Sequence, residues 1–169
     1  MTTVERNADD LTLEPASGLD LDALIRLLSS SHLPVADLES HLAAFTLAKR
    51  AGIVVGSAGL ESYGELALLR SLCVAEEHRS KRIGVKLVSA VESQACAQGV
   101  RDLYLLTNGA ASYFANLGFV PIDRSQAPLE IRNTAQFSAW CPASAVCMHR
   151  TIGRPLEPAG NSSAARRAG

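Results

Sequence analysis

The spacing of apolar residues changes several times between residues 11 and 152 of this chain. Apolar residues at every second position, or in a short unbroken run, predict a strand, and apolar residues every three or four positions predict a helix. Strands are predicted over 11–13, 45–48, 53–60, 66–74, 103–106, 119–122 and 145–152. Helices are predicted over 21–28, 35–41, 83–95, 111–117 and 128–140.

The order of these elements determines the expected fold class. The strands at 45–48 and 53–60 are joined by a short turn and form a predicted hairpin, whereas a helix separates the strands at 66–74 and 103–106. Both kinds of connection together predict an α/β fold, with a mixed central sheet of six to seven strands flanked by helices. The run 66–74 is almost wholly apolar, which is typical of a central strand buried on both faces.

Length and composition are those of one globular domain. The chain has 169 residues, of which 47% are hydrophobic and 20% are charged. We expect the domain to cover 11–152, between an N-terminal tail (1–10) and a C-terminal tail (153–169) that have no apolar period and are expected to be disordered. The formal net charge of -1 argues against nucleic acid or an anionic membrane as a partner.

The cellular compartment is predicted from segments that the sequence lacks. No apolar run approaches the length of a membrane span, and the polar N-terminus does not have the pattern of a signal peptide. The four cysteines form no Cys-x-x-Cys pair and have no histidine at zinc-finger spacing, so we expect reduced thiols and no metal. These patterns predict a cytoplasmic protein.

The charged loop between the strand at 66–74 and the helix that begins at Ile83 is the most informative segment. Backbone amides at the start of a helix are unpaired, and the helix dipole favours an anion beside them. Arg79, Lys81 and Arg82 add positive charge around the same point. This pattern suits a pyrophosphate group; the alternative is a solvated charged loop before an ordinary helix.

Two segments then resemble a known family. Residues 79–84, Arg-Ser-Lys-Arg-Ile-Gly, resemble the acetyl-CoA-binding motif Arg/Gln-x-x-Gly-x-Gly/Ala of the GNAT superfamily of N-acetyltransferases. Residues 113–119, Tyr-Phe-Ala-Asn-Leu-Gly-Phe, resemble its second motif, a short helix that ends in Leu-Gly-Phe. The resemblance covers about 11–152 and implies the GNAT fold with acetyl-CoA as cosubstrate. The cofactor-binding residues that it implies are Leu72, Cys73, Val74, Arg79, Ser80, Lys81, Arg82, Ile83, Gly84, Val85, Asn108 and Phe114.

A narrower resemblance is to the arsenic-resistance N-acetyltransferases. The segments that carry it are 33–38, 59–64, 68–72 and 131–137, the last continued by 141–144. This resemblance implies transfer of an acetyl group to the amine of a small amino-acid-like molecule, an organoarsenical in arsenic resistance and detoxification among the candidates.

Two positions depart from the superfamily pattern. Arg82 replaces the first glycine of the motif and places a Cβ and a guanidinium near the cofactor phosphates. The tyrosine that usually protonates the leaving thiolate would stand five residues before Phe119, but that position is Phe114 and the tyrosine is Tyr113. One residue corresponds to about 100° of helix rotation. Tyr113 is therefore the candidate acid, and if it does not reach the sulfur, the thiolate leaves with a proton from water or with none.

The mechanism implied by the resemblance is direct attack of an amine on the thioester, which requires alignment and a polarised carbonyl. We expect the carbonyl to accept a hydrogen bond from a backbone amide near 72–74, freed by a bulge or by separation of the strands. Glu61 follows the apolar strand at 53–60 and is the candidate base; the alternative is a solvated acidic residue in a turn.

Arg70 interrupts the otherwise apolar run at 66–74. A buried guanidinium needs a partner or a cleft, because burying it alone is very costly. We predict that Arg70 binds the carboxylate of the acceptor, with a structural salt bridge as the alternative. Ser71, Thr134 and Gln136 complete the predicted acceptor site.

Three classes of function remain open at this point. The first is a small-molecule N-acetyltransferase, with a small amine as its partner and a homodimer as a possible assembly. The second is a protein or peptide N-acetylase. The third is a non-catalytic module that binds acyl-CoA or a metalloid. Cys141 and Cys147 could bind a trivalent arsenical, but buried structural thiols are the favoured interpretation.

Overall fold

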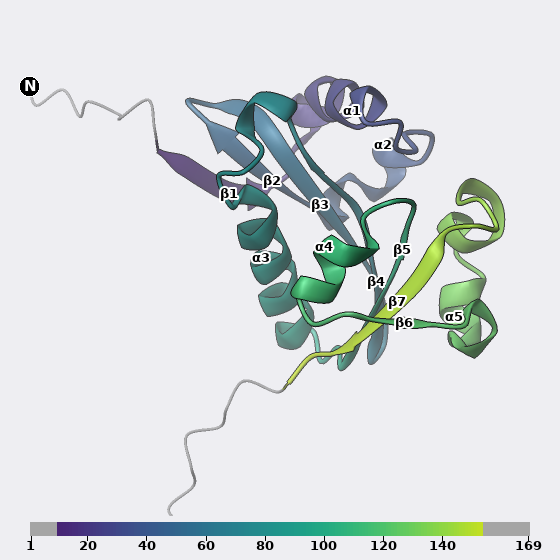
Figure 1. The fold of residues 1–169 in the computed structure, drawn as a ribbon. Coiled ribbons are helices and arrows are strands. Elements are labelled where there is room, and N and C mark those ends of the chain that lie inside the picture. Colours follow the sequence, from purple (N-terminus) through teal and green to yellow (C-terminus); the bar gives the residue numbers. More distant parts are fainter. Residues whose placement is uncertain (1–9, 154–169) are drawn as a thin grey trace, which may run out of the picture.

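The structure of the protein is a computed structural model that describes residues 10–153. The predicted tails lie outside the described residues, apart from Asp10 and Gly153. The described residues form a seven-stranded sheet in the order β1-β2-β3-β4-β5-β7-β6, with helices on both faces (Figure 1). No helix within 10–153 is long and apolar enough to cross a membrane.

Each strand predicted from the apolar pattern is present, with small changes in its limits. The strands are β1 (Leu11–Pro15), β2 (Phe45–Arg50), β3 (Ile53–Tyr63), β4 (Leu66–Val74), β5 (Asp102–Thr107), β6 (Val120–Ile122) and β7 (Val146–Thr151). The helices are α1 (Leu21–Ser30), α2 (Leu38–His41), α3 (Ile83–Ala97), α4 (Ala111–Asn116) and α5 (Leu129–Arg132). Short 3-10 turns are η1 (Gly18–Asp20), η2 (Leu42–Ala44), η3 (Glu76–His78) and η4 (Arg124–Gln126).

The predicted helix over 128–140 is wrong. Only one α-helical turn, α5, forms at its start, and a π-helical turn, η5 (Gln136–Trp140), forms at its end. Between them the hydroxyl of Thr134 donates to the carbonyl of Ile131 at 2.7 Å. A threonine hydroxyl that bonds to nearby backbone competes with regular helix, so the apolar period continues here without a continuous helix.

The sheet is mixed because one of its strand pairs is parallel. Strands β1 to β4 pair antiparallel in chain order, β4 pairs parallel with β5, and β7 pairs antiparallel with both β5 and β6. A parallel pair needs a crossover connection, and α3 provides it between β4 and β5. The expectation of a mixed sheet with both hairpins and crossovers is confirmed.

Three apolar clusters hold the layers together. The largest packs α3 and α4 against one face of the sheet, the near face in Figure 1, and includes Ala67 and Leu69 of β4. A second cluster joins α1 and α2 to the sheet, and a third packs α5 and η5 against Leu68. Since neighbouring residues of a strand point to opposite faces, β4 is covered on both sides, as predicted for a central strand.

A bulge in β4 reverses which of its residues face α3. Gly59 pairs with Arg70 and Ser57 pairs with Cys73, so Ser71 and Leu72 together oppose one residue of β3. Ser71 adopts a left-handed backbone conformation, with φ of 55°. Before the bulge, odd-numbered residues such as Leu69 pack against the α3 side, and after it Leu72 packs there. Arg70 therefore points away from α3.

Strands β4 and β5 also separate beyond their first residues. Their pairing covers Leu66–Leu68 of β4 and Asp102–Tyr104 of β5, while β5 stays paired with β7 up to Thr107. From Leu69 onward, the side of β4 that faces β5 has no strand partner among residues 10–153. The bulge and the strand separation expected from the sequence are both present.

Asp20 links the first strand pair to the start of α1. Its carboxylate accepts hydrogen bonds from Ser17 N at 2.9 Å and Ser17 Oγ at 3.0 Å, and it pairs with Lys49 Nζ at 2.8 Å. Burial alone would raise the pKa of Asp20, but the bonds from Lys49 and Ser17 outweigh burial and lower that pKa. A lowered pKa stabilises the fold above the unfolded pKa of about 3.9, and the stabilisation is lost as the pH falls through the folded pKa.

We therefore expect Asp20→Asn to lower the free energy of unfolding at pH 7 by about 1.5–3 kcal/mol, because a hydrogen-bonded charge is lost. The difference from the parent protein should shrink as the pH falls below about 4, where Asp20 becomes protonated in the unfolded state, and disappear below the lower pKa of the folded state. Urea unfolding at pH 7, 5 and 3 measures this, with the exposed Asp22→Asn as the control. A difference of equal size at pH 7 and pH 3 would contradict the assigned role.

Candidate active site

A groove of about 520 Å³ runs along the α3 side of the open strand β4. We call it the α3 groove. One wall is the end of β4 and the other is α4, and the loop before α3 closes one end. Its lining residues are Leu72, Cys73, Val74, Arg79, Ser80, Arg82, Gly84, Val85, Ala110, Tyr113 and Phe114. Ten of these eleven residues, all except Ala110, were among the predicted site residues.

The loop before α3 has the backbone of an anion site. Ser80 and Arg82 both have left-handed backbone conformations, with φ of 67° and 60°. Residues that alternate in this way turn successive N–H groups toward one point and form a concave anion nest. Arg82 is also the N-cap residue of the 15-residue helix α3, so the unpaired amides of the first turn open onto the same place. The arginine that replaces the motif glycine keeps the glycine-like backbone geometry.

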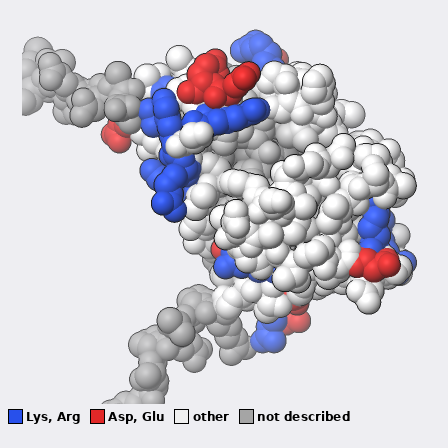
Figure 2. Space-filling model, viewed as in Figure 1, with Lys and Arg blue, Asp and Glu red and all other residues white. Residues whose placement is uncertain are grey.

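Charged side chains surround this loop. Arg79, Lys81, Arg82 and Lys86 are exposed, and Glu76 and Glu77 lie beside them. Figure 2 shows basic and acidic side chains gathered over the loop between β4 and α3. The side chain of Arg79 turns back so that Nε donates to the carbonyl of Val74 at 3.1 Å, which ties the loop to the end of β4.

Tyr113 and Phe114 occupy different parts of α4. Phe114 is 7% exposed and packs edge-to-face on Phe119, with ring centroids 5.8 Å apart. Tyr113 is 39% exposed and its hydroxyl lies against Gly84, where an added Cβ would meet it at 2.5 Å. The position of the superfamily's usual acid is thus a core residue, and the displaced tyrosine points at the start of α3.

A second cavity of about 150 Å³ lies across β4 from the α3 groove. We call it the β4–β5 pocket, because it opens where those strands separate. Its lining residues are His32, Leu33, Pro34, Leu68, Leu69, Arg70, Ser71, Leu106, Asn108, Gln136, Trp140, Cys141, Pro142 and Ala145. The two cavities are adjacent at the bulge, since Ser71 lines one and Leu72 lines the other.

The N–H groups of Arg70 already donate hydrogen bonds to acceptors within the protein. Nη1 donates to Asp37 at 2.5 Å and to Glu61 at 2.8 Å, and Nη2 donates to Asp37 at 2.9 Å. Nε donates to the hydroxyl of Ser71 at 3.2 Å. When the amide oxygen of Gln136 faces the guanidinium, it accepts from Nη2 at 3.1 Å and Nε at 3.3 Å. All five N–H groups of an arginine thereby face an acceptor.

The prediction that Arg70 binds the carboxylate of an acceptor is corrected by these contacts. Its side chain is 2% exposed and forms the alternative, a structural salt bridge with Asp37 and Glu61. Burial alone would raise the pKa of Asp37, but the hydrogen bond and charge of Arg70 outweigh it and lower that pKa. Asp37 therefore stays ionised at neutral pH and anchors the segment between α1 and β2 over β4.

Glu61 is held in the same network. Its carboxylate accepts from Arg70 and, at 2.8 Å, from the hydroxyl of Tyr63. Burial and the bond to Glu61 raise the pKa of Tyr63 to about 12. Glu61 lines neither the α3 groove nor the β4–β5 pocket. The expected role as catalytic base therefore has no geometric support, because the carboxylate already serves Arg70.

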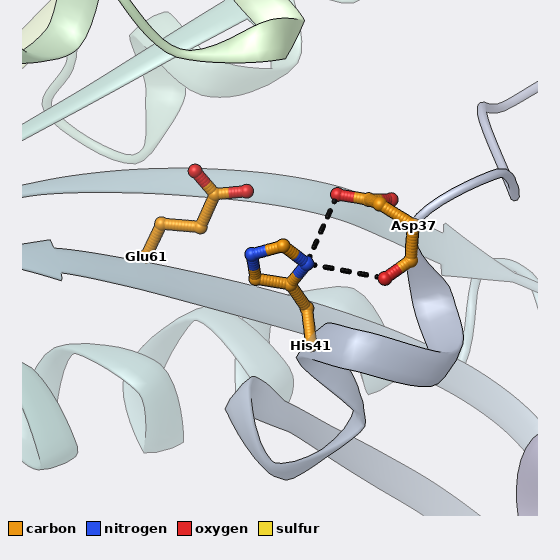
Figure 3. A group of neighbouring side chains, drawn as sticks. All are labelled: Asp37, His41 and Glu61. Atoms are coloured by element: carbon orange, nitrogen blue, oxygen red, sulfur yellow. Dashed lines mark hydrogen bonds and ion pairs between the residues drawn. The ribbon is translucent and has the colours of Figure 1, made fainter.

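Asp37, His41 and Glu61 bring oxygen and nitrogen atoms within 4.8 Å of one another. Figure 3 shows the ring of His41 bonded to Asp37, while the carboxylate of Glu61 stands apart from that ring. His41 Nδ1 lies 3.1 Å from the Asp37 carbonyl and 3.4 Å from its carboxylate. Both carboxylates accept from the same Arg70 nitrogen, so a guanidinium supplies the positive charge that a metal ion would bring.

Four predicted site residues lie elsewhere than expected. Asn108 lines the β4–β5 pocket and not the predicted cofactor side. Ile83 is 1% exposed and points into the core, so only its backbone is available. Lys81 is exposed and outside the lining of the α3 groove. Thr134 is 5% exposed and bonds to the carbonyl of Ile131, which makes it a structural residue of the turn after α5.

Two site residues were not foreseen as such. Asp37 carries the main ion pair of Arg70, and Trp140 lies 5.8 Å from the same guanidinium, with its ring in the wall of the β4–β5 pocket. The sequence signal for a partner of Arg70 was the buried charge itself, which requires an opposite charge. It did not identify which carboxylate, because Asp37 and Arg70 are 33 residues apart.

Comparison with known proteins agrees with this arrangement. Residues 41–121 match the model of the acetyltransferase (GNAT) domain. The chain is 34% identical over 125 residues to an amino-acid acetyltransferase of Aeromonas salmonicida, an alignment that covers 70% of this chain and 28% of that protein. It is 33% identical over 98 residues to an uncharacterized N-acetyltransferase of Chlorobaculum tepidum, covering 57% and 63%. The chain thus spans less than a third of the amino-acid acetyltransferase that it matches.

Solved structures share the fold. N-acetylglutamate synthase from Neisseria gonorrhoeae, complexed with coenzyme A and N-acetyl-glutamate, superposes with a TM-score of 0.74 at 21% identity, covering 86% of this chain and 36% of that one. The protein Rv2747 from Mycobacterium tuberculosis, in complex with CoA and NLQ, also gives 0.74, at 19% identity over 84% and 99%. The chain therefore has the GNAT fold that its motifs predicted, and its residues 41–121 match the acetyltransferase (GNAT) domain model.

Proposed function

We propose that this protein is an N-acetyltransferase that moves an acetyl group from acetyl-CoA to the amine of a small amino-acid-like molecule. The observation that carries the proposal is the meeting of two cavities at the bulge of β4. The α3 groove has the donors that a phosphorylated cofactor requires, and the β4–β5 pocket has the size of a small acceptor. The unpaired side of β4 connects them.

The residues of the α3 groove fit acetyl-CoA. Left-handed Ser80 and Arg82 turn amides toward one point at the start of α3, which suits the two negative groups of a pyrophosphate. Gly84 has no Cβ to narrow the groove where the Tyr113 hydroxyl approaches it. The unpaired side of β4 offers backbone hydrogen-bonding groups to the pantetheine arm of the cofactor, which contains two amides. Acetyl-CoA supplies the acetyl group as an activated thioester.

The chain's own residues then contribute position and polarity. A free backbone N–H beside the bulge polarises the carbonyl, and the rigid strand aligns the acceptor amine with it. The amine forms a bond to the carbonyl carbon, the C–S bond breaks, and coenzyme A leaves as a thiolate that takes a proton from water. With Glu61 engaged by Arg70, the proton of the amine passes to water or to His32, which lines the β4–β5 pocket. Imidazole is the side chain most often used for this step.

The acceptor class is proposed from the relatives and from the pocket. The curated relatives include amino-acid acetyltransferases, and a structural neighbour holds N-acetyl-glutamate. In this chain the β4–β5 pocket offers polar contacts from His32, Asn108, Gln136 and Trp140. The guanidinium of Arg70 is not free to bind the acceptor, because Asp37 and Glu61 already accept its hydrogen bonds. The sequence resemblance adds an amino-acid-like organoarsenical to the candidate acceptors, with a role in arsenic resistance.

The proposal predicts that acetyl-CoA stabilises the fold. A ligand at 100 times its dissociation constant adds about 2.7 kcal/mol, which raises the melting temperature by about 5–10 °C for a domain of this size. Thermal unfolding with and without the cofactor measures this. Turnover is then tested on a panel of amino acids, their decarboxylated analogues and an organoarsenical amino acid, with free thiol and a gain of one acetyl group as readouts. An unchanged melting temperature at millimolar acetyl-CoA contradicts the proposal.

Replacing Gly84 with aspartate should abolish much of the cofactor affinity. The new Cβ would meet the hydroxyl of Tyr113 at 2.5 Å, and the carboxylate would repel the pyrophosphate. We expect the Kd for CoA to rise by about 10–100-fold in a protein that still folds, which calorimetry and circular dichroism check together. Gly18→Asp, where an added Cβ meets nothing within 4 Å, is the matched control. An unchanged Kd in the folded Gly84→Asp variant would place the phosphate site elsewhere.

Removing the charge of Asp37 should loosen the wall of the β4–β5 pocket, where we propose that the acceptor binds. Asp37→Asn leaves Arg70 with one carboxylate partner and frees the segment that carries His32, Leu33 and Pro34. We expect a loss of about 3 kcal/mol in the free energy of unfolding and a severalfold rise in KM for the acceptor, with KM for acetyl-CoA unchanged. The exposed Glu39→Gln on α2 controls for the charge. Equal rises in both KM values would show that Asp37 does not act on the acceptor side.

A further inference from the structure

Tyr113 connects α4 to the start of α3. It belongs to the six-residue helix α4, and its ring stands edge-to-face on Phe114, with centroids 5.4 Å apart. Its hydroxyl lies against Gly84, the second residue of α3. The first-turn amides of α3 have no partner within the helix, so this hydroxyl stands beside free donors at the end of the α3 groove.

The same contact places the hydroxyl at the Val74 end of β4. The position that a Cβ of Gly84 would take is 2.5 Å from Tyr113 Oη and 3.8 Å from Cγ2 of Val74, the last residue of β4. Ser71 is three residues before Val74, about 10 Å along a strand that rises about 3.3 Å per residue, so the hydroxyl lies nearer to the Val74 end of β4 than to Ser71. A general acid must come within about 3.2 Å of the atom that it protonates. We infer that Tyr113, placed at the Val74 end of the strand, is not the acid for a thioester that reacts at Ser71.

The hydroxyl is suited to donate to an anion. Burial raises the pKa of Tyr113, so the phenol keeps its proton at neutral pH. The α3 groove that Tyr113 lines also contains the anion nest at Ser80 and Arg82 and the side chains of Arg79 and Arg82. No carboxylate lines the α3 groove within residues 10–153, so the hydroxyl has no competing anionic acceptor there.

We propose that Tyr113 is a cofactor-binding residue whose hydroxyl donates a hydrogen bond to the pyrophosphate of acetyl-CoA, and that it is not the acid of the reaction. The inference rests on the proposed function, because it assumes that the α3 groove holds acetyl-CoA. It deepens that function by assigning the displaced tyrosine to the phosphate end of the groove. Gly84 is then required because any larger residue would push the hydroxyl away.

The test compares binding and turnover in Tyr113→Phe. We expect the Kd for CoA, measured by calorimetry, to rise by about 10–100-fold, as for loss of a hydrogen bond to a charged group. At saturating acetyl-CoA, kcat should fall by less than about threefold. With S-acetyl-pantetheine, which has no pyrophosphate, variant and parent should have the same kcat/KM. Tyr104→Phe on β5, whose ring packs on His149, is the matched control and should match the parent in every measurement.

Two results would overturn the inference. A fall in kcat of about 100-fold or more with unchanged CoA affinity would make Tyr113 the acid. An equal loss with acetyl-CoA and with S-acetyl-pantetheine would place its contact on the pantetheine arm. If the parent protein itself fails to bind CoA, the proposed function fails before the role of Tyr113 is reached, so the two failures are distinguishable.

A double-mutant cycle with Gly84→Ala gives a second measurement that does not depend on activity. The alanine Cβ displaces the hydroxyl, so Gly84→Ala and Tyr113→Phe should remove the same hydrogen bond. We expect the double variant to bind CoA as weakly as the weaker single variant. Losses that multiply fully in the double variant would show that the two residues act independently and would overturn the inference.

Discussion

One extra residue in β4 organises the site of this protein. The bulge at Ser71 and Leu72 shifts the alternation of side chains by one residue, so Arg70 faces the α1 and α5 side while Leu72, two residues later, faces α3. Beyond Leu68 the strand also leaves β5. The left-handed backbone of Ser71 is a local strain that the surrounding bonds hold in place.

Arg70 is the side chain that links this bulge to distant parts of the chain. It bonds to the neighbouring Ser71, to Glu61 on β3 and to Asp37 between α1 and β2, and the amide of Gln136 in η5 lies beside it. A buried guanidinium is stable only when such partners are complete. The segments that contribute them also wall the β4–β5 pocket. The same ion pairs therefore stabilise the fold and shape the acceptor side.

The two motif departures have a common physical setting at the other end of β4. Arg82 keeps the left-handed backbone of the glycine that it replaces, and Tyr113 presents its hydroxyl to the first turn of the same helix. Phe114, at the usual tyrosine position, joins the core instead. Both departures thus place polar groups around the start of α3, where we propose that the phosphates bind.

The order of elements, the central strand, the charged loop before α3 and the need of Arg70 for a partner could all be predicted from the sequence, because apolar period and helix-start chemistry are properties of short segments. Only the packing of distant segments shows that Asp37 and Glu61 are those partners, that Asn108 lines the β4–β5 pocket and that Thr134 interrupts the helix predicted over 128–140. These outcomes depend on which segments pack together. Asp37 and Arg70 meet across 33 residues, and no local period records such a contact.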